Sequence, residues 1–117
     1  EVEFDYAPFG ITGLETEFAL SLMQLYHTKR LGLSDLIAKY TVVPAQLLGF
    51  KKGALSLGAD ADVTIFSPDE EWTFDRNSSL SKSQNSPFYG WRLKGKVTAT
   101  IVSGKRIASE QNALAGV

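Results

Sequence analysis

The sequence predicts an α+β domain, with helices in the first half of the chain and a small antiparallel sheet in the second. Apolar residues recur at helical spacing from Leu14 to Tyr26, whereas beyond Gly53 glycines separate short runs of β-branched and aromatic residues. With 44% hydrophobic and 21% charged residues, the composition is that of a soluble globular protein. A chain of 117 residues supplies one domain, which would bury roughly two-thirds of its unfolded surface.

The first helix is expected over residues 15–28, after a loop without any hydrophobic period. Thr12 and Glu15 have the spacing of a capping box, in which a hydroxyl and a carboxylate satisfy the free amides of a helix start. The basic pair at positions 29 and 30 suits the negative end of this helix, and Gly32 is expected to end it. Its apolar stripe comprises Leu14, Phe18, Leu22, Leu25 and Tyr26.

Two shorter helices are expected next. The dipeptide Ser34-Asp35 is predicted to cap a helix over residues 35–40. Pro44, which is favourable in the first turn of a helix, is predicted to begin a third helix that ends at Gly49.

The strands are predicted from alternation of side chains. Residues 61–66 alternate, and in residues 97–102 Val97, Ala99 and Ile101 are expected on one face of the sheet. The dipeptide Ser103-Gly104 predicts a tight reversal into a last strand over residues 105–108, which completes a hairpin. Four aromatic residues are expected in the sheet core, namely Trp72, Phe74, Phe88 and Trp91.

Several functional classes have no support in the composition. The net charge of −1 gives no global attraction to nucleic acid or anionic lipid, and the absence of cysteine excludes disulfides and thiolate metal sites. No apolar run approaches the roughly 20 residues that span a bilayer. The chain begins with Glu1 and its only methionine is Met23, from which we expect an excised piece of a longer protein.

Two sequence blocks are similar to a known family. The segments Ala7-Pro8-Phe9-Gly10-Ile11-Thr12-Gly13-Leu14-Glu15-Thr16 and Leu80 to Val97, with its Asn85-Ser86-Pro87-Phe88-Tyr89-Gly90-Trp91 core, resemble blocks of bacterial dihydroorotases. Segment 41–49 resembles a further segment of the same family, whereas segment 52–63 resembles a pattern shared across the wider amidohydrolase superfamily. On this resemblance the chain is expected to be the C-terminal part of a dihydroorotase.

The resemblance implies a fold and a division of the chain. Residues 1–50 would be the end of a (β/α)₈ barrel, comprising a substrate loop, the last barrel helix and two short helices. Residues 51–117 would be the C-terminal part of a small β-sandwich. The fold class expected is therefore an α+β fragment that completes a larger enzyme.

The resemblance also implies an activity for the whole enzyme. Dihydroorotases are zinc-dependent, cytoplasmic hydrolases that interconvert N-carbamoyl-L-aspartate and dihydroorotate in pyrimidine biosynthesis. By analogy, Phe9 and Gly10 would bind substrate, largely through main-chain atoms. The residues supply no catalytic group and no metal ligand set, because His27 is the only histidine. We therefore expect the chain by itself to bind no zinc and to be inactive.

Other candidate residues have structural interpretations. Asp5 is expected to be a surface acid rather than a catalytic one. His27 is expected to lie near the end of the first helix, where a partly charged imidazole is mildly favourable. Asp60 and Asp62 are expected to be turn residues rather than ligands of a hard cation. A basic cluster near Trp91 comprises Arg92, Lys94, Lys96, Lys105 and Arg106. Its first three members alternate with apolar positions, so we expect them on the solvated face of a sheet rather than on nucleic acid.

Alternatives remain open. One is a non-catalytic dihydroorotase-like subunit that acts as a scaffold for aspartate transcarbamoylase. Another is a different cyclic amidohydrolase, such as an allantoinase or a dihydropyrimidinase, and a third is a free-standing β-rich binding module. The apolar stripe of the first helix would also lack the barrel strands on which it packs, so self-association of the chain, or packing of its helices on its own sheet, is expected.

Overall fold

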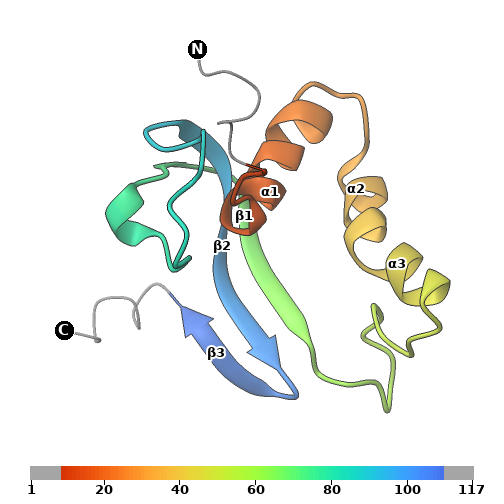
Figure 1. Ribbon diagram of the computed structural model, residues 1–117. Helices are drawn as coiled ribbons and strands as arrows, with labels where there is room; N and C mark the ends of the chain where they lie inside the picture. Colours follow the sequence, from red (N-terminus) through yellow and green to blue (C-terminus); the bar gives the residue numbers. More distant parts are fainter. Residues whose placement is uncertain (1–8, 110–117) are drawn as a thin grey trace.

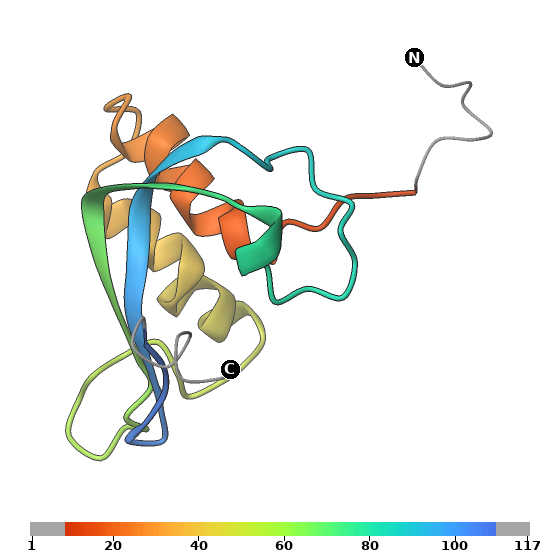
Figure 2. The same cartoon turned by 90° about the vertical axis from the view of Figure 1, so that its left-hand side faces the viewer.

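The computed structural model describes residues 9–109, and it shows helices on one face of a three-stranded antiparallel sheet (Figures 1 and 2). The strands lie in the order β1-β2-β3. The predicted α+β arrangement, with helices first and strands second, is confirmed for these residues. The elements are α1 (Leu14–Ser21), η2 (Leu22–Tyr26), α2 (Leu33–Tyr40), α3 (Val42–Leu47), β1 (Val63–Thr73), η3 (Arg76–Ser78), β2 (Arg92–Val102) and β3 (Lys105–Ser109).

The first predicted helix is present, but its ends differ from the prediction. It begins as α1 and continues as one π-helical segment, η2, to Tyr26. The chain then turns at Lys29, whose φ is +60°, and the amides of Lys29 and Arg30 donate to the carbonyls of Tyr26 and Leu25, at 2.9 Å each. Lys29 thus ends the helix, and the prediction that Gly32 does so is wrong.

Gly32 instead immediately precedes α2, and its carbonyl accepts from the amide of Leu36 at 3.0 Å. The predicted cap by Ser34-Asp35 is therefore displaced, because both residues already lie in the first turn of the helix. The third helix agrees better with the sequence. Pro44 lies in the first turn of α3, and the helix ends just before Gly49.

The core lies where α1 and η2 pack on β2. Ala19, Phe74 and Leu93 form a buried cluster, and Leu22 is fully buried beside it. Leu22 lies so close to Gly95 of β2 that a Cβ at Gly95 would overlap Leu22 Cδ1. The helix can therefore approach the strand only because position 95 lacks a side chain.

Aromatic contacts join the helices to the sheet. The ring of Phe18 packs edge-on against Phe66 of β1, with centroids 4.9 Å apart, and against Tyr40 of α2, at 5.5 Å. Two members of the predicted apolar stripe, Phe18 and Leu22, therefore pack on the chain's own sheet. Its first member does not, because Leu14 is 91% exposed.

The strands are longer and less regular than predicted. The register shifts between Ile65 and Phe66, so that Ile65 pairs with Ala99 while the adjacent Phe66 pairs with Val97. Adjacent strand residues face opposite sides, so this bulge places Val97 and Ala99 on opposite faces. The prediction that Val97, Ala99 and Ile101 share one face is wrong for Val97.

The predicted hairpin between the last two strands is confirmed. Ser103 and Gly104 both have positive φ, +50° and +76°, as a two-residue type I′ turn requires. The amide of Ser103 also donates to Asp62 Oδ1 at 2.8 Å, which ties the turn to the start of β1. Across the part of the chain that the structure describes, no helix is long and apolar enough to cross a membrane.

Candidate functional site

The two sequence blocks of narrow family resemblance meet in the structure, although about 70 residues separate them. The loop of residues 9–13, here called the N-terminal loop, lies beside the segment of residues 79–91 (Figure 2). The amide of Thr12 donates to the carbonyl of Asn85 at 2.9 Å, and the Asn85 side-chain amide donates to the carbonyl of Gly10. These two hydrogen bonds bracket Ile11 and fasten the N-terminal loop to the second block.

Glu15 makes a second link between the two blocks. Its carboxylate accepts hydrogen bonds from Ser79 Oγ at 2.7 Å, from the amide of Leu80 at 3.0 Å and from the amide of Ser81 at 3.2 Å. The predicted capping box is therefore wrong, because Gly13 is the N-cap of α1 and no side chain caps it. The carboxylate accepts hydrogen bonds from the loop that follows η3 rather than from the amides at the start of its own helix.

The surroundings of Glu15 favour its charged form. Partial burial acts to raise the pKa of Glu15, but the hydrogen bonds from Ser79, Leu80 and Ser81 together outweigh burial. The pKa of Glu15 is consequently lowered from its ordinary value. The ionised carboxylate holds residues 79–81 close to the start of α1, because charge-assisted hydrogen bonds are stronger than neutral ones.

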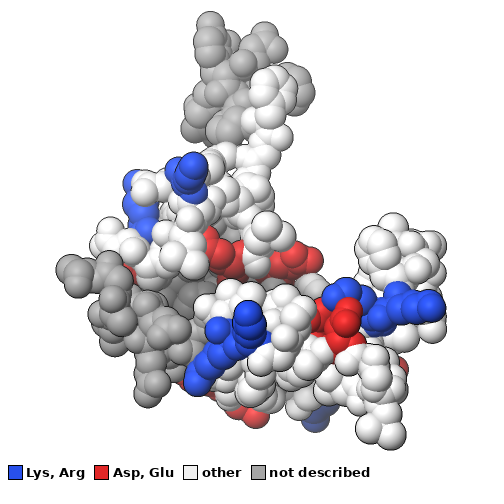
Figure 3. Space-filling view, turned by 90° about the horizontal axis from the view of Figure 1, so that it is seen from below, with Lys and Arg blue, Asp and Glu red and all other residues white. Residues whose placement is uncertain are grey.

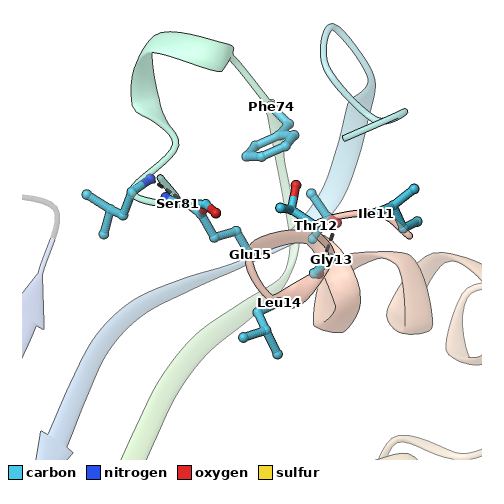
Figure 4. A pocket seen from close by; sticks show the side chains of 9 residues that line it. Ile11, Thr12, Gly13, Leu14, Glu15, Phe74 and Ser81 are labelled. Carbon is cyan, nitrogen blue, oxygen red and sulfur yellow. Dashed lines mark hydrogen bonds between the residues drawn. The ribbon is translucent and has the colours of Figure 1, made fainter. Parts of the chain in front are cut away.

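A cavity of about 440 Å³ opens between the two blocks. Figure 4 shows Glu15 directed toward Ser81, Phe74 on the other side of the cavity and Leu14 pointing away from Phe74. The lining is Ile11, Thr12, Gly13, Leu14, Glu15, Thr16, Phe74, Leu80 and Ser81. This lining contains no cysteine, lysine or histidine, and its one carboxylate already accepts three hydrogen bonds, so the cavity presents no nucleophile paired with a free base.

The two predicted substrate-binding residues lie at the outer end of the N-terminal loop. Phe9 is fully exposed, and a Cβ built on Gly10 would meet no atom within 4 Å. Within the described part of the chain, Gly10 accepts a hydrogen bond at its carbonyl from the Asn85 side chain. The structure thus leaves the loop's main chain accessible, and the role of both residues in substrate binding remains a prediction.

Sequence reasoning missed Asn85 and the contact made by Glu15. Both residues stand inside the two blocks, but neither block by itself reveals a contact with the other. A family block that contains no reactive side chain is a signal that its residues hold another segment in place. Asp5, which precedes the first block, lies outside the described residues.

The other ionisable candidates have structural partners. His27 Nε2 forms a hydrogen bond of 2.8 Å with the carbonyl of Pro68, and Lys52 Nζ makes ion pairs with Asp60, at 3.1 Å, and Asp62. The hydrogen bond from Lys52 and that from the Ser103 amide lower the pKa of Asp62. Asp60 and Asp62 are therefore ion-pair partners in the segment that leads into β1, where the amide of Asp62 donates to the carbonyl of Asp60 at 2.9 Å.

A catalytic zinc site does not fit the described residues. Among residues 9–109, no group of three or more His, Cys, Asp or Glu side chains could hold a metal ion. A zinc site needs three or four such ligands around one point. We therefore assign no step of a reaction to a metal held by these residues.

The basic residues of β2 are paired across the sheet. Arg92 pairs with Glu71, Lys94 with Asp69 at 3.4 Å and Lys96 with Glu70 at 3.3 Å. The face shown in Figure 3 likewise carries both signs of charge, interspersed among other residues. Such pairing lowers the positive potential that a phosphate backbone would require.

The predicted aromatic core is confirmed only in part. Phe74 is buried, and Trp72 and Phe88 pack around its cluster. Trp72 Nε1 donates to the carbonyl of Gly95 at 2.8 Å. Trp91 is 48% exposed, so its assignment to the core is wrong.

We predict that Glu15→Gln reduces the acid sensitivity of the fold. Because the folded-state pKa of Glu15 lies below its unfolded value, its contribution is present above about pH 4.3 and is lost as pH falls through the folded value. At pH 7 the variant should lose about 1 kcal/mol of unfolding free energy, a modest figure because the site is exposed to solvent. Urea unfolding between pH 7 and pH 3 measures both effects.

Ser79→Ala is the graded control for this prediction, because it removes one donor and leaves the amides of Leu80 and Ser81 in place. It should cost less stability than Glu15→Gln. Equal stability of wild type and Glu15→Gln at pH 7 and at pH 3 would contradict the role of this carboxylate.

The family is shown by comparison with known proteins. The model of the amidohydrolase family matches residues 5–107 of the chain. The chain therefore belongs to the amidohydrolase family. Within this family its sequence is similar to curated dihydroorotases: it is 48% identical to the dihydroorotase of Syntrophus aciditrophicus (strain SB) over 110 residues, which are 94% of this chain. The chain spans about a quarter (26%) of the length of that relative.

Solved structures place the fold in the same family. The L-hydantoinase (dihydropyrimidinase) from Arthrobacter aurescens matches with a TM-score of 0.79 and 33% identity, over 86% of this chain and 23% of its own. The D-hydantoinase (dihydropyrimidinase) from a Thermus species matches with a TM-score of 0.81 over 92% of this chain and 24% of its own. Its 23% identity supports the fold alone.

Proposed function

We propose that the chain is the C-terminal part of a dihydroorotase, which interconverts N-carbamoyl-L-aspartate and dihydroorotate in pyrimidine biosynthesis. The observation that carries the proposal is the contact between its two dihydroorotase-like blocks, which Asn85 and Glu15 fasten together. The 48% identity to a curated dihydroorotase, against 33% to an L-hydantoinase, supports this substrate over that of the hydantoinases.

The proposed contribution of these residues is to present a main-chain surface to the substrate. Hydrolysis of the cyclic amide adds water across a ring C–N bond, which yields a carboxylate and frees the ureido nitrogen. The residues that activate this water, and the zinc that the family resemblance implies, would belong to the rest of the longer protein. Phe9 and Gly10 would contact the substrate through the exposed backbone of the N-terminal loop.

The proposal extends to the arrangement of the longer protein. Residues 1–50 would complete a (β/α)₈ barrel, with α1 and η2 as its last helix, and residues 51–117 would join a β-sandwich. Support comes from large apolar side chains that are exposed together on α3 and just after it, namely Val43, Leu47, Leu48 and Phe50. Soluble monomers rarely leave such surface uncovered, so further chain is expected to cover it.

Location and partners complete the proposal. The enzyme would act in the cytoplasm on a small-molecule substrate, and aspartate transcarbamoylase is the candidate protein partner. The 117-residue chain by itself is expected to self-associate through the apolar surface that the rest of the enzyme would cover. A scaffold role beside the transcarbamoylase, without catalysis, is the alternative that these residues leave open.

The test compares the full-length protein with residues 1–117. The full-length protein is expected to contain zinc and to turn over dihydroorotate, whereas the 117-residue chain should bind no stoichiometric zinc and show no turnover. Zinc content by atomic absorption and ring opening by loss of ultraviolet absorbance measure these outcomes. A full-length protein that binds the transcarbamoylase but lacks turnover would favour the scaffold role. Turnover of dihydroorotate by residues 1–117 alone would overturn the proposal that the catalytic residues lie in the rest of the longer protein.

A further inference from the structure

We infer that Asn85 is a positioning residue, which orients the peptide between Gly10 and Ile11 so that the Ile11 amide faces an acceptor oxygen of the substrate. The inference rests on the proposed function and adds a named donor to it. It starts from the hydrogen bond that the Asn85 side chain donates to the Gly10 carbonyl.

Hydrogen bonds, rather than packing, hold this part of the N-terminal loop. Phe9 is fully exposed, Ile11 is 60% exposed and Gly10 has open space where a side chain would be. A segment without packed side chains retains much conformational freedom, because little opposes the entropy of its backbone. The two bonds to Asn85, through the Gly10 carbonyl and the Thr12 amide, therefore determine the direction of this backbone.

The geometry of the peptide bond transmits this constraint to Ile11. The carbonyl of Gly10 and the amide N–H of Ile11 belong to one planar trans peptide and point in opposite directions. Once Asn85 holds the carbonyl, the Ile11 N–H is directed away from the 79–91 segment. Among the described residues this amide has no hydrogen-bond partner, so it is a free donor on an exposed loop.

A fixed main-chain donor suits the substrate class of the proposed function. Dihydroorotate and N-carbamoyl-L-aspartate both carry carboxylate and carbonyl oxygens, which accept hydrogen bonds from backbone amides. A donor that is oriented before binding costs less conformational entropy when the substrate arrives. Loss of Asn85 should therefore weaken substrate binding more than it slows the chemical step.

The test uses the full-length enzyme with three substitutions. Asn85→Ala removes the side-chain donor but keeps the backbone carbonyl that accepts from Thr12. Asn85→Asp keeps the shape but offers no donor to Gly10. Gln84→Ala is the matched control, because Gln84 is the exposed neighbour and its side chain makes no hydrogen bond or ion pair within the described part.

We expect Asn85→Ala and Asn85→Asp to raise KM for dihydroorotate about tenfold, the effect of one hydrogen bond, with kcat changed less than about twofold. Hydrogen exchange of the segment that contains Ile11 should become faster in both variants, whereas Gln84→Ala should match wild type in all three measurements. Unchanged KM and exchange in Asn85→Ala would overturn the inference.

Failure of the proposed function is recognised separately. If the wild-type full-length protein does not turn over dihydroorotate, the proposed function fails, and equilibrium binding of dihydroorotate then decides the inference. Weaker binding by Asn85→Ala than by wild type and Gln84→Ala would support the positioning role. Equal binding by all three proteins, or no binding by any, would reject it.

Discussion

Gly95→Ala is expected to lower the free energy of unfolding by about 3 kcal/mol. Gly95 has a φ of +106°, which side chains rarely adopt, and an added Cβ would overlap Leu22 Cδ1. Leu22 is fully buried and cannot move aside without disturbing the packing of η2 on β2. Urea denaturation of the 117-residue chain, followed by tryptophan fluorescence, measures the loss.

Gly90→Ala separates the two causes. Gly90 also has a positive φ, +81°, but a Cβ there would meet nothing within 4 Å. Its substitution should cost about 1 kcal/mol, the strain of the backbone alone. If Gly95→Ala and Gly90→Ala cost the same, the close approach of Leu22 to β2 contributes nothing measurable, and the proposed packing is wrong.

Leu93→Ala is the second large effect, with an expected loss of about 3 kcal/mol. Leu93 is fully buried in the cluster with Ala19 and Phe74, so its removal leaves a cavity in the centre of the core. The midpoint of urea unfolding should fall while the dependence on urea concentration stays the same.

Leu57→Ala is the control, because it makes the same substitution at a leucine that is not buried. Leu57 is fully exposed in the loop before β1, and its truncation should change the unfolding free energy by less than about 0.5 kcal/mol. A loss at Leu57 as large as that at Leu93 would place the core elsewhere.

The order of the elements could be predicted from local patterns, because these depend on residues near one another in the chain. Helical spacing gave the first helix, and the Ser103-Gly104 dipeptide gave the hairpin turn. The faces of β2 could not be predicted in the same way. The bulge opposite Ile65 and Phe66 depends on how two strands pair, which their separate alternation does not reveal.

In the candidate site, too, local patterns could be predicted from the sequence, whereas long-range contacts could not. Resemblance drew attention to Phe9 and Gly10, and the spacing of Thr12 and Glu15 suggested a local cap. The structure directs Glu15 to amides 65 and 66 residues away, where two backbone donors and one hydroxyl converge. A carboxylate can serve either set of amides, and only the tertiary fold decides which set is nearer.

The fastening of the N-terminal loop has a consequence for the order of folding. Asn85 and Gly10 are 75 residues apart, and closing so long a loop costs more chain entropy than forming the hairpin of β2 and β3. The contact can form cheaply only after β1 and β2 have paired and brought both blocks together. The N-terminal loop is therefore among the last segments to become ordered and among the first to open, so it can release its contacts while the sheet stays intact.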